Sequence, residues 1–119
     1  MDYDIQTAES LFKARRYIYV IFMCHLAVEK LLKALIAESA AAPPPRTHNL
    51  YRLLELANVA LPQAHSDIVA KLNTMSIATR YPEDVAALAA EVTRKVAQDY
   101  LTATKECIQW LRHDARLQP

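Results

Sequence analysis

The chain has 119 residues, of which 53% are hydrophobic, and a formal net charge of +1. That length suits one domain with a single core, here expected over residues 1–119, and the composition is typical of a globular protein. There is no glycine, which excludes Gly-rich phosphate loops, dinucleotide-binding fingerprints and glycine-based hairpins. Leucine and alanine dominate and both favour helices, so the composition predicts an all-α fold.

Two segments bear on cellular location. The first six residues contain two aspartates before any apolar run, so they predict no signal peptide. The longest apolar run, Tyr17–Cys24, is far shorter than the roughly 20 residues of a membrane span. We therefore expect a soluble, cytoplasmic protein. In that compartment Cys24 and Cys107, both at apolar helix positions, are expected as free buried thiols and not as a disulfide or a metal pair.

The first helix is expected from Asp4, as N-cap, to about Arg15. Its inward face would carry Ile5, Ala8, Leu11 and Phe12. A second helix spans about Tyr17 to Ser39, where the segment SAAAPPPR ends it because three prolines cannot continue a helix. We expect a tight turn between the two helices, with one continuous helix as the alternative.

The second helix is apolar around most of its circumference between His25 and Ile36. One narrow polar stripe, His25, Glu29 and Lys33, recurs every four residues, and Lys30 lies beside it. A buried helix must pair such charges or open them onto a cleft. The stripe is therefore a candidate site; an ordinary exposed Glu29–Lys33 pair is the alternative.

The third and fourth helices are short. Thr47 or Asn49 caps the third, and Pro62 separates it from the fourth, which Ser66 caps. The apolar spacing predicts buried residues at Leu50, Leu53, Leu54 and Ala57, and then at Ile68, Val69, Leu72 and Met75.

After a break at residues 77–81, one last helix is expected from Pro82 to about Arg112, roughly 40–45 Å long. Its inward residues recur every three to four positions: Val85, Ala89, Val92, Val96, Tyr100, Ala103, Cys107 and Leu111. The predicted fold is an up-and-down bundle of four main helices plus one shorter helix.

The sequence shows few patterns typical of metal binding or catalysis. The four histidines are scattered without metal-ligand spacing, and His25 with Glu29 supplies two ligands, too few for a metal site. No catalytic group and no cofactor site is expected. Three basic clusters occur, each expected as a solvated helix face and not as a nucleic-acid footprint: Lys13 with Arg15 and Arg16; Arg94 with Lys95; and Arg112 with Arg116.

The segment TRYPED, residues 79–84, is unusual. Arg80 and Tyr81 together suit recognition of a phosphate or carboxylate, or a buried hydrogen bond between helices. Glu83 and Asp84 follow at the start of the last helix, where acidic residues are favourable. The candidate ligand-binding residues are Arg80, Tyr81, Glu29, Lys30, Lys33, His25 and Asp84.

Three segments together resemble the HEPN domain family: AVEKLLKAL (Ala27–Leu35), THNL (Thr47–Leu50) and TRYPED (Thr79–Asp84). HEPN denotes a higher-eukaryote and prokaryote nucleotide-binding helical domain. The resemblance implies a helical bundle that forms a homodimer. Prokaryotic members are often encoded beside a minimal nucleotidyltransferase in toxin–antitoxin pairs, some are metal-independent ribonucleases, and a related domain at the end of sacsin is thought to bind nucleotides.

The HEPN ribonucleases carry an Arg followed, after four to six residues, by a His. From Arg80 that His would stand at Val85, Ala86 or Ala87, so the motif lacks its proton-transfer group. Three functions remain as alternatives. In the first, the chain is a non-catalytic module that binds a partner protein, a minimal nucleotidyltransferase, or weakly binds a nucleotide-like anion or RNA near Arg80. In the second it is a ribonuclease toxin with a diverged site that uses His25 or His48, and in the third it is a helical scaffold without ligand.

Two contacts are also expected. Glu29 should pair with Lys33 along its helix and with Arg80 across the bundle, because a buried carboxylate needs a partner. A homodimer should form because the long last helix overhangs so small a bundle.

Overall fold

The computed structural model describes residues 2–39, 45–75 and 81–118. These residues form six α-helices and one short 3₁₀ helix, with no strand among them: α1 Asp2–Lys13, α2 Tyr17–Ser39, α3 Leu50–Ala57, α4 Gln63–Thr74, α5 Pro82–Ala89, α6 Arg94–Arg112 and η2 Ala115–Leu117. The expected all-α fold is confirmed. The radius of gyration is 14.2 Å.

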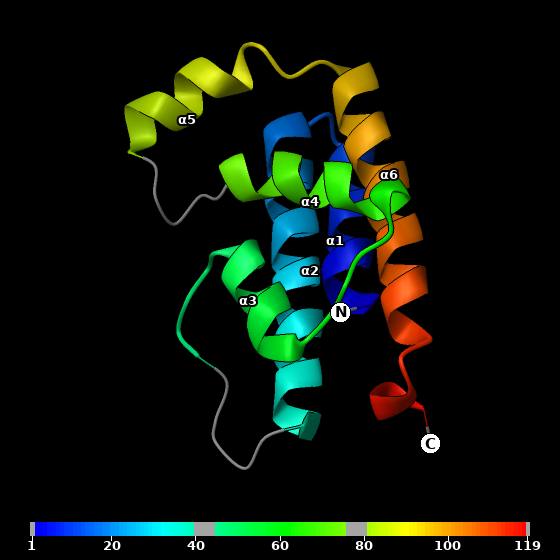
Figure 1. Ribbon diagram of the computed structural model, residues 1–119. Helices are drawn as coiled ribbons and strands as arrows, with labels where there is room; N and C mark the ends of the chain where they lie inside the picture. The colour runs from blue at the N-terminus through cyan, green and yellow to red at the C-terminus, as the bar shows by residue number, and fades with distance from the viewer. Residues whose placement is uncertain (1, 40–44, 76–80, 119) are drawn as a thin grey trace.

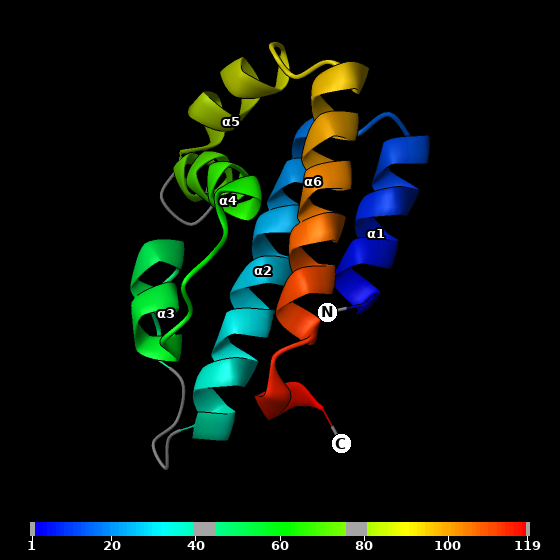
Figure 2. The same ribbon diagram turned by 45° about the vertical axis from the view of Figure 1, so that its right-hand side comes forward.

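Helices α1, α2 and α6 lie side by side, and α2 packs against both of the others (Figures 1 and 2). Helix α1 runs antiparallel to α2, whereas α6 runs in the same direction as α2. Helices α3 and α4 pack on another side of α2, and α4 lies across the long helices. The expected simple up-and-down bundle of four is therefore wrong in detail, because the last expected helix is two helices and α4 is not aligned with the rest.

Helix α2 contributes more buried residues to the core than any other described helix, as its nearly continuous apolar circumference requires. Cys24 on α2 and Cys107 on α6 are fully buried and free, as expected. Burial raises the pKa of each thiol to about 11. Both groups are therefore inert thiols of the α2–α6 interface.

A turn interrupts the chain between the end of α1 at Lys13 and the start of α2 at Tyr17, so the alternative of one continuous helix is wrong. Arg15 adopts a left-handed conformation with φ 63°. The amide of Arg15 donates to the carbonyl of Phe12, and the amide of Arg16 donates to that of Leu11, the Schellman pattern that ends many helices. Asp4 is not the N-cap, since α1 begins at Asp2 and Asp4 is buried within it.

Asn49 caps α3, and Thr47 supports it. The Asn49 side chain accepts from the amides of Tyr51 and Arg52, and Thr47 Oγ1 accepts from the amide of Asn49. The expected inward residues of α3 and α4 are confirmed, although Leu54 is only partly buried. Ser66 is not a cap, because α4 begins directly after Pro62 and the Ser66 hydroxyl donates to the Gln63 carbonyl.

The expected single helix from 82 to 112 is interrupted. Helix α5 ends at Ala89, and Thr93 caps α6 by accepting a hydrogen bond from the amide of Val96. Of the expected inward residues, Cys107 and Leu111 are buried, Val96 is exposed, and the others pack against the core while partly buried: Val85, Ala89, Val92, Tyr100 and Ala103. Helix α6 also buries Ala97, Leu101, Thr104 and Ile108. Helix α6 alone is about 28 Å long, so the overhang that motivated a homodimer is not there.

Candidate functional site

The polar stripe of α2 meets the segment that leads into α3. Glu29 accepts from Lys33 at 3.1 Å, and both of its carboxylate oxygens lie within 3.0–3.1 Å of His48 Nδ1. His25 Nδ1 lies 3.6 Å from Glu29 Oε1. We call His25, Glu29, Lys33 and His48 the Glu29 cluster. The expected Glu29–Lys33 contact is confirmed, and the alternative of an exposed pair is wrong because Glu29 is only 4% exposed.

Neighbouring groups keep Glu29 charged in spite of its burial. Burial by itself raises the pKa of Glu29, but the hydrogen bonds from His48 and Lys33 and their charges lower it below its ordinary value. Burial lowers the pKa of His25, an effect that the Glu29 carboxylate opposes. The cluster thus combines an ionised Glu29 with a His25 whose protonated form is disfavoured.

The THNL segment places His48 at this point. Asn49 caps α3 with its side chain, and Asn73 of α4 accepts a hydrogen bond from the amide of Leu50 at 2.8 Å. These bonds form the cap of α3 and fix its start against α4. His48 therefore faces Glu29 within the same chain, and not across a dimer interface.

A carboxylate holding one imidazole nitrogen is an arrangement that proton-transfer sites use. His25 is 5% exposed and its Nε2 has no hydrogen-bond partner. Within the described ranges no group of three potential ligands could hold a metal ion. The Glu29 cluster is best understood as the bond that fastens the α3 segment to α2.

Lys30 lies apart from the Glu29 cluster. Its ammonium is 3.1 Å from Asp4 Oδ2, so it pairs α2 with α1. Asp4 is buried while Lys30 is half exposed. Of the four α2 candidates, three are therefore brought together and Lys30 is not.

The start of α5 is the second candidate region. Tyr81 is 70% exposed and is the N-cap residue of α5, with no side-chain capping bond. Glu83 and Asp84 lie exposed in the first turn. Arg80, and with it the expected Glu29–Arg80 pair, lies outside the described residues. Among the residues described, no hydrogen bond or ion pair joins Tyr81 or Asp84 to the Glu29 cluster.

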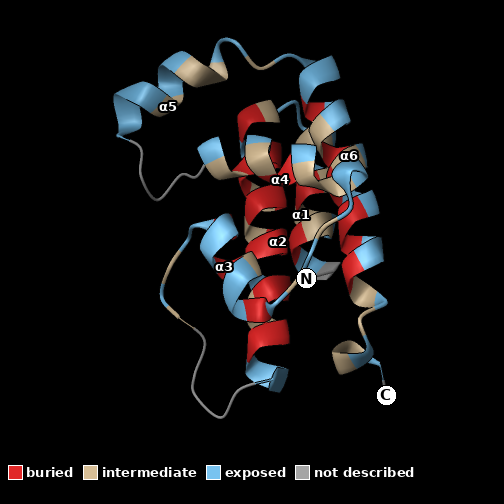
Figure 3. Cartoon of the chain, viewed as in Figure 1, coloured by how far each residue is buried: buried red, intermediate tan, exposed pale blue. Residues whose placement is uncertain are grey.

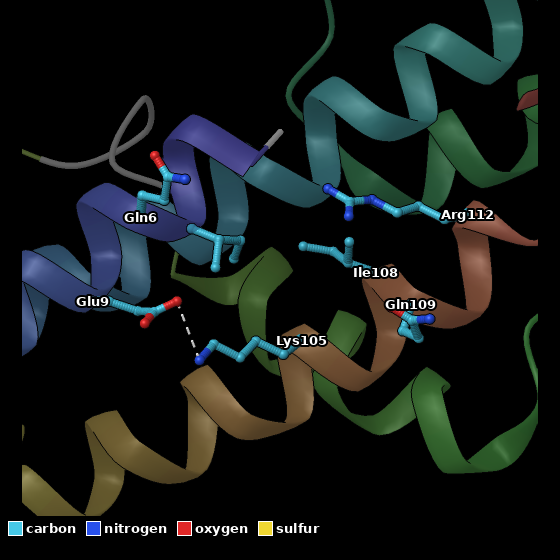
Figure 4. A pocket seen from close by; sticks show the side chains of 7 residues that line it. Gln6, Glu9, Lys105, Ile108, Gln109 and Arg112 are labelled. Carbon is cyan, nitrogen blue, oxygen red and sulfur yellow. Dashed lines mark ion pairs between the residues drawn. The ribbon is translucent and has the colours of Figure 1, made fainter.

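A cavity of about 370 Å³ lies elsewhere, between α1 and α6 (Figure 4). The ion pair between Glu9 and Lys105, 3.2 Å apart, spans it. Ile5, Gln6, Ile108, Gln109 and Arg112 complete its walls. Its walls carry both charge signs, from Glu9, Lys105 and Arg112.

Comparison with protein families gives one match: the HEPN domain model covers residues 2–114. This chain is a member of the HEPN family. Comparison with curated proteins and with solved structures gave no match. The match includes all three segments that resemble the family, and two of them, AVEKLLKAL and THNL, supply Glu29 and His48, the residues that meet in the structure.

The contact between His48 and Glu29 is the feature that the sequence did not predict. Nothing in the spacing of residues 29 and 48 indicates a contact, since the SAAAPPPR segment lies between them. The signal was the pair of family segments itself. No helix within the described ranges is long and apolar enough to cross a membrane.

Proposed function

We propose that this HEPN protein is a non-catalytic binding module: it forms a homodimer through α5, and the dimer binds a partner protein. HEPN membership points to a minimal nucleotidyltransferase as that partner. The single observation that carries the proposal is the exposure of α5.

Helix α5 contains five consecutive apolar residues, Val85–Ala89, yet none of its residues is buried. Val85, Leu88 and Ala89 only partly pack against the core, and Ala86 and Ala87 are exposed. Figures 1 and 3 show α5 projecting from the end of the bundle, mostly pale blue. A helix of eight residues is marginal on its own in water, so its apolar surface is best explained by a second copy that covers it.

The same helix supports a role without catalysis. Ribonuclease members need a His after the conserved Arg, and positions 85–87 carry Val, Ala and Ala. The two histidines that a diverged site would use are both at Glu29, where His25 is buried and His48 Nδ1 is hydrogen-bonded. No histidine therefore stands at the start of α5 among the residues described.

Light scattering tests the homodimer. The wild-type protein should have a mass near that of two 13.5 kDa chains, 27 kDa. Ala87→Glu places a charge on the exposed face of α5 and should return the mass to 13.5 kDa. Ala37→Glu, the same change at an exposed position of α2, should leave the dimer intact. A wild-type mass near one chain at every concentration contradicts the proposal.

Native mass spectrometry of the complex isolated from the protein's own cells tests the partner. We expect a second protein chain beside the dimer, identifiable as a nucleotidyltransferase. If the dimer is recovered alone under conditions that preserve weak complexes, the proposed partner protein is contradicted and only the homodimer remains.

A further inference from the structure

The fold brings two basic clusters to one end of the bundle. Lys13, Arg15 and Arg16 lie where α1 turns into α2, and Arg94 begins α6. In Figure 2 the end of α1 and the start of α6 lie at the same end of the molecule. The contact is direct, because the Arg94 guanidinium lies 5.1 Å from the centre of the Phe12 ring on α1. We call Lys13, Arg15, Arg16 and Arg94 the basic end.

The cations of the basic end are exposed, and within the described ranges none of them forms an ion pair. Lys95, next to them, is paired with Asp99 at 3.4 Å. Glu91, in the α5–α6 connection, is the nearest acidic residue in sequence to Arg94. The whole chain carries a net charge of +1, so the positive charge is local and not a property of the whole surface.

A cavity of about 170 Å³ opens beside these cations. It is lined by Arg15, Arg16, Tyr17, Tyr19, Ala89 and Val92, among others. Tyr19 is 45% exposed, and an edge contact with Phe22 holds its ring. Pockets that enclose a whole small-molecule ligand are about 300–1,000 Å³, so this one suits a single phosphate or sugar unit of a longer ligand.

Arg15 occupies the left-handed position that glycine would fill at lower energy. The turn therefore has an arginine in a backbone conformation that is costly for any residue with a Cβ atom. Three of the four cations are arginines, whose planar group binds phosphate with two parallel hydrogen bonds.

From this arrangement we propose that the basic end binds single-stranded nucleic acid. Lys13, Arg16 and Arg94 contact successive phosphates, Arg15 binds a phosphate at the mouth of the cavity, and a base stacks on the exposed ring of Tyr19. Basic side chains that follow the backbone and aromatic rings that stack on bases are how sequence-tolerant single-strand sites work. This site lies away from the start of α5, and it goes beyond the protein-binding role proposed above.

The experiment measures fluorescence anisotropy of a labelled single-stranded oligonucleotide of mixed sequence across a series of salt concentrations. Arg16→Ala/Arg94→Ala removes two cations of the basic end. Arg46→Ala/Arg52→Ala removes two exposed cations near α3 and is the matched control. We expect roughly tenfold weaker binding near 0.15 M salt and a salt slope lower by about 1.4 in the first variant, since each lost phosphate contact on a single strand lowers the slope by about 0.7. The control should match the wild type.

Two further variants separate the contributions. Tyr19→Leu keeps an apolar side chain and should weaken binding by at least about fivefold with an unchanged salt slope, because stacking is not ionic. Arg80→Ala should bind as the wild type does. Loss of binding in Arg80→Ala but not in the basic-end variant would place the ligand at the start of α5 and overturn the inference.

Competing ligands decide the remaining alternatives. Polyglutamate and vesicles containing anionic lipid are offered at equal charge concentration. Tighter binding to either one than to the oligonucleotide, or an equal loss in the basic-end variant and its control, would also overturn it. Circular dichroism checks that each variant is folded, and light scattering on the same samples shows whether a failure concerns this site or the dimer.

Discussion

Glu29 forms a polar contact between α2 and the segment that leads into α3. It accepts from Lys33 and His48 at 3.0–3.1 Å while only 4% of its surface is exposed. Breaking such a buried arrangement leaves its remaining polar groups without partners.

Glu29→Gln should therefore destabilise the protein by about 2–3 kcal/mol, measured as a lower urea midpoint at pH 7. Because the folded pKa of Glu29 lies below its ordinary value of 4.5, this contribution is present above pH 4.5 and is lost as the pH falls below it. The difference between wild type and variant should narrow in acid. An unchanged midpoint at pH 7 would show that the contact contributes nothing to stability.

His25 predicts a second pH effect with its own range. Burial lowers the pKa of His25 from 6.5, so the unfolded chain takes up this proton before the folded chain does. The contribution of neutral His25 to the free energy of unfolding is fully present above pH 6.5. It falls as the pH drops below 6.5, and the loss is at most about 1.4 kcal/mol at pH 5.5. His25→Gln should lose less stability than the wild type between pH 7.5 and pH 5.5. A pH profile identical to that of the wild type would assign the effect to another group.

The sequence predicted the contact between Glu29 and Lys33 within α2, but not the contact between Glu29 and His48 from another segment. Glu29 and Lys33 share one helix face, so their contact follows from helix geometry alone. His48 reaches Glu29 only because Asn49 and Asn73 fix the start of α3. That depends on the packing of three helices, which spacing does not encode.

At the scale of elements, the apolar periodicity predicted α1 to α4 well and misjudged the last segment. Residues 90–93 contain neither glycine nor proline, so the apolar spacing continues across the break. The signal was Thr93, a favourable N-cap residue within an apparently continuous helix. Val96, near the start of α6, is exposed, whereas Cys107 and Leu111 of the same expected series are buried.

Arg116 joins η2 to two helices. It donates to the Ala57 carbonyl at the end of α3, to the Ser39 hydroxyl at the end of α2, and to Asp114. The hydrogen bonds that the side chain and the backbone of Arg116 donate to Asp114 lower the pKa of Asp114 from 3.8 to about 2.

Arg116→Gln should cost about 1 kcal/mol at neutral pH, a modest value because about a quarter of the Arg116 and Asp114 side chains is exposed to screening solvent. Since the folded pKa of Asp114 is depressed, the ionic part of this loss is present above pH 3.8 and disappears as the pH falls toward 2. Thermal unfolding at pH 7 and pH 2.5 measures it. Arg16→Gln, which removes an exposed arginine that forms no ion pair among the described residues, should not show the same pH dependence.

For the whole molecule, we propose binding without cleavage. Ribonuclease members of the family carry a His that follows their Arg after four to six residues, and the corresponding positions after Arg80 hold Val85, Ala86 and Ala87.

We therefore expect no cleavage when the purified protein is incubated with single-stranded RNA, judged against buffer alone and against Arg80→Ala. Cleavage by the wild type that is lost in Arg80→Ala would contradict the non-catalytic proposal. His48→Ala would then show whether the histidine at Glu29 had taken the role, because His25 is too buried to reach RNA.

The rate at which the two buried thiols are alkylated measures how often the core opens. Cys24 and Cys107 are fully enclosed on the two helices whose packing forms the centre of the core, so an alkylating reagent reaches them only during the moments when α2 and α6 separate. The alkylation half-life then reports how often the core opens, residue by residue, without any label being introduced. A ligand that joins the α1–α2 turn to the start of α6 must hold those helices together and lengthen that half-life, whereas a partner that covers only α5 leaves it unchanged.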